Sequence, residues 1–102
     1  MTSSRSPMDG QQVPVNMYET EGAVVVVAPF PGVMEDDVVV KLDGRTLTLR
    51  AEMRTAAQKD YLLHEWHYGP WERTLEIPEG FGDRFETSFG NGQLAVRVLR
   101  SS

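Results

Sequence analysis

Two histidines, His64 and His67, are the residues that most suggest metal chemistry in this sequence. A separation of three residues would place both imidazoles on one face of a helix, but residues 61–68 have the composition of an extended segment. Along a strand, side chains three positions apart point to opposite faces. The chain also has no cysteine, which excludes a thiolate nucleophile and a cysteine-based zinc site. We therefore expect no metal site.

Three consecutive acidic residues, Glu35, Asp36 and Asp37, are the second group that could do chemistry. Paired carboxylates can act as general acid and base, but a solvated turn before the apolar residues 38–42 explains them more simply. No G-x-S-x-G motif presents a serine nucleophile, and no glycine-rich loop precedes a helix that could bind phosphate. The sequence therefore predicts a protein that is not an enzyme and needs no cofactor.

Charge and length restrict the remaining classes of partner. The 102 residues include 10 Lys and Arg against 15 Asp and Glu, giving a net charge of −5. Nucleic-acid binding requires clustered basic residues, which this sequence lacks. The longest apolar run is too short to span a bilayer, and the N-terminus has no secretory signal pattern. We expect one cytoplasmic domain with neither a nucleic acid nor a membrane as partner.

Short β-type segments separated by turn residues follow one another along most of the chain, and no long amphipathic helix interrupts them. Asp43-Gly44 and Asn91-Gly92 are strong hairpin signals. This pattern predicts an all-β fold, an immunoglobulin-like antiparallel β-sandwich. We expect a flexible N-terminal arm at 1–12, the sandwich at 13–100 and a short tail at 101–102. The expected strands are residues 13–19, 23–28, 38–42, 46–52, 61–68, 71–77, 84–89 and 93–99.

Five motifs along the chain resemble parts of the alpha-crystallin domain of prokaryotic small heat-shock proteins. They are FPGV at 30–33, DDVVV at 36–40, LDGRTLTL at 42–49, YGPWERTLEIPE at 68–79 and FGNGQLAV at 89–96. The resemblance implies an ATP-independent chaperone, a holdase that binds partly unfolded client proteins under stress and prevents their aggregation. A monomeric co-chaperone domain of the same fold, docking on a larger chaperone, is the alternative. A β-sandwich ligand-binding module is a third possibility, although the aromatic and acidic loop cluster that it would need is not recognisable.

The resemblance also implies a client-binding groove between two edge strands. One wall would come from Val38, Val40 and Leu42. The other would come from Phe85, Thr87 and Phe89. Edge strands leave backbone N–H and C=O groups unpaired beside apolar side chains, so an extended client segment can add to them by β-augmentation.

Prokaryotic members of this family form homodimers by exchanging a strand, which corresponds here to residues 61–66. The resemblance places Arg73 at or near the same contact, paired with either Glu65 or Glu72. The I-x-I/V tail that builds larger oligomers in the family is not found in this sequence, which argues against assembly beyond the dimer. The expected dimer residues are Tyr61, Leu62, Leu63, His64, Trp66 and Arg73.

Overall fold

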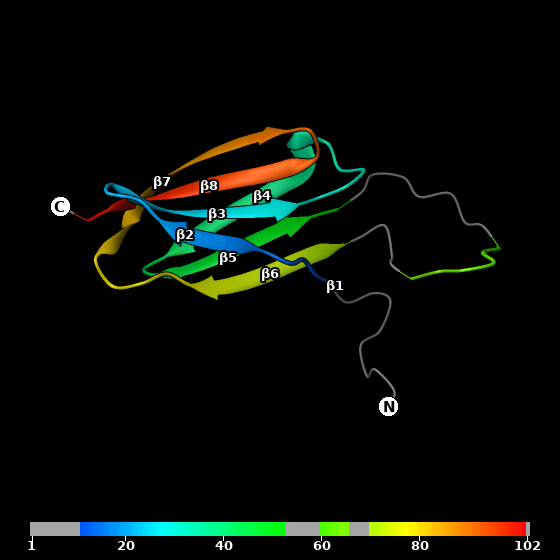
Figure 1. The fold of residues 1–102 in the computed structure, drawn as a ribbon, viewed down its shortest axis with the longest axis horizontal. Helices are drawn as coiled ribbons and strands as arrows, with labels where there is room; N and C mark the ends of the chain where they lie inside the picture. The colour runs from blue at the N-terminus through cyan, green and yellow to red at the C-terminus, as the bar shows by residue number, and fades with distance from the viewer. Residues whose placement is uncertain (1–10, 53–59, 66–69, 102) are drawn as a thin grey trace, which may run out of the picture.

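Two four-stranded sheets form the fold in a computed structural model that describes residues 11–52, 60–65 and 70–101 (Figure 1). One sheet has the strand order β1-β6-β5-β4 and the other the order β2-β3-β8-β7. A single 3-10 turn, η1, precedes β4 in the described part. The elements are β1 (Gln11–Gln12), β2 (Asn16–Glu19), β3 (Ala23–Pro29), η1 (Glu35–Asp37), β4 (Val38–Asp43), β5 (Thr46–Ala51), β6 (Trp71–Glu76), β7 (Phe81–Gly90) and β8 (Gln93–Arg100).

The buried side chains lie between the two sheets. Strand β5 alternates, with Leu47, Leu49 and Ala51 fully buried and the intervening residues half-buried. This period of two is the pattern of a strand that presents one face to the core. The opposite sheet contributes inward-facing residues such as Val26 and Val96, which are register partners. The predicted all-β sandwich is confirmed.

Strand β3 is the most deeply buried strand, because it lies between β2 and β8. Its four consecutive valines include Val24 and Val26, which face the core, and Val25, whose exposed fraction is only 7%. Branched side chains on both faces suit a central strand that is covered on each side.

Both predicted hairpins are present. The first joins β4 to β5 with Gly44 at a φ of 63°, and the second joins β7 to β8 through Asn91 and Gly92 at φ values of 54° and 73°. Two consecutive residues with positive φ are what a type I′ turn requires. Asn tolerates this conformation better than most residues do.

The first part of the chain differs from the predicted strand at 13–19. Gln11 and Gln12 pair in parallel with Trp71 and Glu72 of β6, and the chain then crosses to the other sheet, where β2 pairs with β3. Pro14 lies at the crossing, where its missing N–H suits a break between strands. The expected arm at 1–12 therefore contributes its last two residues to a sheet, and residues 1–10 lie outside the described part.

The expected strand at 61–68 is described only up to residue 65. Residues 60–65 form no strand, and Figure 1 shows them well away from both sheets. Extended backbone needs a neighbouring strand to satisfy its N–H and C=O groups, and no described strand lies beside this segment. Trp66 and His67 lie outside the described residues. Among the residues described, no helix has the length and apolar character needed to cross a bilayer.

Candidate binding groove between the two sheets

Strands β4 and β7 are each the last strand of their sheet, and they lie on the same side of the sandwich. The space between them is a groove with a volume of about 260 Å³. This volume is slightly below the range of about 300–1,000 Å³ that small-molecule sites usually occupy. The groove is lined by Glu35, Val38, Val40, Phe85, Thr87, Phe89 and Leu94.

Five of the six residues predicted for this groove line it, and Leu42 does not. Leu42 is half-buried and packs against the core beyond the end of the groove. Two lining residues, Glu35 and Leu94, were missed by the sequence interpretation. Leu94 could have been found from the hairpin register, because it is the cross-strand partner of Phe89. No periodicity marks Glu35, which precedes the strand.

The groove combines a buried floor with partly exposed walls. Leu94 is only 2% exposed, Val38, Val40 and Phe89 are half-buried, and Phe85 keeps 36% of its surface exposed. Burying an apolar side chain completely contributes about 1.5–3 kcal/mol. A segment that covers these walls would therefore gain apolar contacts and could also pair with the free edge of β4 or β7.

One end of the groove is closed by backbone. A β-carbon built on Gly82 would lie 3.0 Å from the carbonyl oxygen of Gly44 in the β4–β5 turn. Since Gly44 follows β4 and Gly82 lies near the start of β7, the two edge strands run antiparallel. The start of β4, with Glu35 just before it, therefore lies beside Phe89 near the end of β7.

A shift of register in β7 accompanies the closed end. Phe81 pairs with Arg100, and the next register partners are Phe85 and Val98. The residues between them include Gly82 and Asp83, both with positive φ, at 146° and 70°. A bulge of this kind bends the strand and increases its twist. The bend thus begins just before the three residues of β7 that line the groove.

The predicted dimer segment has a different character. Leu62 and Leu63 are 106% and 75% exposed, and the rings of Tyr61 and His64 stack with centroids 4.2 Å apart. No described strand supports these residues. Among residues 11–52, 60–65 and 70–101, no group of three or more His, Cys, Asp or Glu side chains has an arrangement that could hold a metal ion.

Arg73 lies beside Val13 in the same chain. Its Nη1 donates a hydrogen bond of 3.0 Å to the carbonyl oxygen of Val13. Glu72, one of the two acids proposed as its partner, faces Arg50 on the neighbouring strand, with 3.7 Å between Oε2 and Nη1. Glu65, the other candidate, is exposed. Arg73 therefore helps to fix the crossing of the chain from β1 to β2.

A second hollow, of about 270 Å³, lies near the start of β2 and the end of β3. It contains none of the predicted site residues and is lined by Pro14, Val15, Asn16, Val27, Pro29 and Gln93. Unlike the groove, it has no pair of opposed edge strands, because β3 and β8 are both internal to their sheet.

Comparisons with known proteins agree with this architecture. The chain is 24% identical over 87 residues to small heat shock protein C2 of Rickettsia felis, covering 81% of this chain and 56% of that protein. It is 31% identical over 85 residues to spore protein SP21 of Stigmatella aurantiaca, covering 78% and 50%. The chain thus spans about half the length of the curated relatives it matches.

The crystal structure of hspA from Xanthomonas axonopodis has the same fold, with a TM-score of 0.78 at 22% identity over 90% of this chain and 96% of that one. The model of the Hsp20/alpha crystallin family matches residues 16–102, which include β2 to β8 and both walls of the groove. The resemblance seen in the sequence motifs is confirmed, and the chain belongs to the Hsp20/alpha-crystallin family.

Proposed function

We propose that this protein is an ATP-independent holdase that binds extended apolar segments of partly unfolded proteins in the groove between β4 and β7. The observation that carries the proposal is the groove itself, which lies between two free sheet edges and whose lining residues are apolar apart from Glu35 and Thr87. Membership of the Hsp20/alpha-crystallin family supports a chaperone role in general. The absence of cysteine and the acidic composition fit a reducing cytoplasm.

Binding in this groove is weak for each segment. The apolar gain from a few side chains is offset by the lost freedom of two molecules and by the ordering of the segment. Weak binding suits a holdase, because clients have to be released to other chaperones. Backbone pairing with an edge strand does not depend on sequence, so many different clients can bind.

We further propose that residues 61–66 pair with a second copy of the chain and form a homodimer. The exposure of Leu62 and Leu63 supports this, since both side chains present apolar surface that a partner would cover. The free edge of β2 supports it as well, because all four residues of β2 are exposed and no described strand covers its outer side. Mutual exchange would cover both edges in a two-fold symmetric dimer.

The experiment that tests the holdase proposal heats a model client with and without the protein, in the absence of ATP, and follows aggregation by light scattering. We expect suppression at molar ratios between substoichiometric and equimolar. If the folded protein leaves aggregation unchanged at equimolar ratio, the holdase proposal is wrong. Sedimentation in the same buffer measures the dimer. A monomer without holdase activity would favour the co-chaperone alternative.

A further inference from the structure

We propose that the groove selects client segments in which a Lys or Arg lies beside a pair of apolar anchors, and that Glu35 determines this selection. The inference rests on the proposed function and specifies the class of segment that binds. Its basis is the charge of Glu35, which lines the groove.

Glu35 is the only charged residue among those that line the groove, and none of the lining residues is basic. It belongs to η1 together with Asp36 and Asp37, which do not line the groove. The ion pairs among the described residues engage other acids, such as Glu76 with Arg45 and Glu86 with Arg97. Within that part of the chain, no basic side chain forms an ion pair with Glu35, and its carboxylate is exposed.

The groove fixes where a charged side chain of the client would lie. The β4–β5 turn approaches Gly82 closely beyond Leu42, whereas Glu35 lines the groove at its other end, near Val38 and Phe89. A segment that lies along the groove therefore has one end beside Glu35. In an extended segment, side chains two positions apart point to the same face, about 6.5–7 Å apart. If two apolar side chains of the client segment face the groove walls, the next client side chain on the same face lies near Glu35.

A cation at that position would meet the exposed carboxylate of Glu35 beside the apolar side chains of the groove. An anion there would be repelled by the carboxylate of Glu35. The contribution is modest, because Glu35 is exposed and such ion pairs are screened by salt. This electrostatic contribution is enough to rank client segments of similar apolar content, and it still allows many different sequences to bind.

Three fluorescein-labelled peptides test this inference. Each contains Leu-Thr-Leu flanked by serines, with Lys, Gln or Glu placed two residues outside each Leu, so that either binding direction presents the same charge. Dissociation constants from fluorescence anisotropy should show the Lys peptide binding about 2- to 5-fold more tightly than the Gln peptide, and the Glu peptide more weakly than both. This preference should shrink between about 0.05 M and 0.5 M salt.

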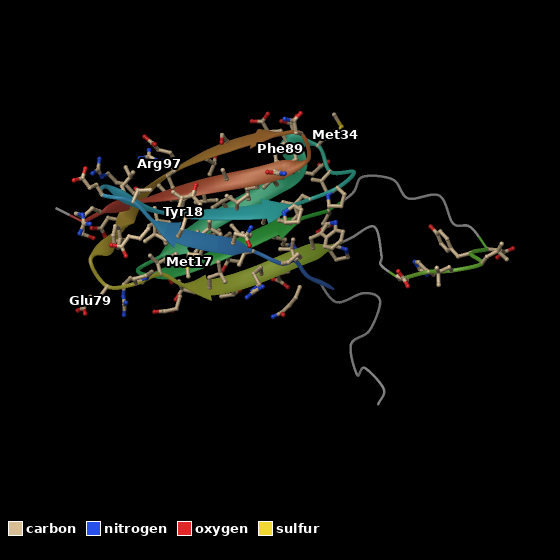
Figure 2. The ribbon with its side chains drawn as sticks, in the orientation of Figure 1. Met17, Tyr18, Met34, Glu79, Phe89 and Arg97 are labelled. Atoms are coloured by element: carbon tan, nitrogen blue, oxygen red, sulfur yellow. The ribbon has the colours of Figure 1, made fainter. Side chains whose placement is uncertain are left out.

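Variants separate Glu35 from the overall negative charge of the protein. Glu35→Gln should remove the preference for Lys, and Glu35→Lys should reverse it in favour of the Glu peptide. Glu79→Gln is the matched control, because Glu79 is exposed, does not line the groove and lies at the opposite end of the sandwich from Phe89 (Figure 2). It should keep the preference of the unaltered protein.

Equal affinity for the Lys and Gln peptides would overturn the inference and leave the holdase proposal standing. An equal loss of preference in Glu35→Gln and Glu79→Gln would also overturn it, because the net charge would then be the cause. If none of the three peptides binds, the inference is wrong, and the aggregation assay decides separately whether the holdase proposal is wrong too.

Discussion

In the groove, apolar side chains are held between two sheets, whereas in residues 60–65 they project from a segment that no described strand supports. Val40 and Phe89 of the groove are half-buried and pack against the core. Leu62 is fully exposed. The groove is therefore a preformed surface whose walls depend on the stability of the sandwich. The segment gains its apolar contacts only from another molecule, so changes there should leave folding intact.

The largest effect is expected from charging the segment. The double variant Leu62→Asp/Leu63→Asp should raise the dimer dissociation constant at least about 100-fold, because two apolar contacts worth about 1.5–3 kcal/mol each would be lost. Analytical ultracentrifugation measures the constant. The melting temperature of the dissociated chain should not fall, since both side chains are exposed. An unchanged dissociation constant would show that this segment is not part of the dimer interface.

The closed end of the groove should respond next most strongly. Gly82→Ala forces a side chain onto a backbone with a φ of 146° and places its β-carbon 3.0 Å from the Gly44 oxygen. We expect a loss of about 1–3 kcal/mol in the free energy of unfolding, measured by urea denaturation. Gly80→Ala is the comparison: Gly80 also has a positive φ, of 99°, but its added β-carbon would meet nothing within 4 Å. An equal loss in both variants would show that the contact with Gly44 has no effect of its own.

Charging the groove should reduce client protection with little effect on the dimer. For Val40→Asp/Phe89→Asp we expect about a tenfold higher concentration for half-suppression of aggregation, because the walls lose apolar contacts with the client. Val39→Asp is the control, since Val39 lies on the same strand, is 45% exposed and faces away from the groove. If both variants lose protection equally, or if the groove variant also dissociates the dimer, the two regions are not separate.

The smallest effect is expected on the outer face of the β7–β8 pair. Arg97 and Glu86 are register partners joined by an exposed ion pair. Arg97→Gln should lower the free energy of unfolding by less than about 1 kcal/mol. Neither client protection nor the dimer should change. A loss of protection in this variant would extend the binding surface beyond the groove.

Most of the fold could be predicted from the sequence because strand periodicity and turn residues are local signals. Alternation in residues 46–51 and the pairs Asp43-Gly44 and Asn91-Gly92 identified strands and hairpins. The parallel pairing of Gln11 and Gln12 with β6 was missed. The pairing is one of backbone groups, and two polar residues carry no periodic signal for it.

The groove was predicted through the family resemblance, and its two ends were not. Val38, Val40 and Leu42 are spaced two residues apart along β4, so the alternation of a strand assigns all three to one face. The contact between the β4–β5 turn and Gly82 ends the groove before Leu42, and a contact between distant parts of the chain leaves no local pattern. Glu35 entered the site because η1 turns beside Phe89, which is likewise a tertiary effect.

The register of β5 with β6 has a consequence for variation in this fold. Ala51, the last residue of β5, pairs with Trp71, the first residue of β6. The chain between them thus leaves the sheet and returns to it at one place. The entropy of closing a loop grows only with the logarithm of its length, so a doubling costs about 0.6 kcal/mol. Insertions, deletions or a grafted recognition sequence can be accommodated at this position, while the sandwich and its groove keep their shape.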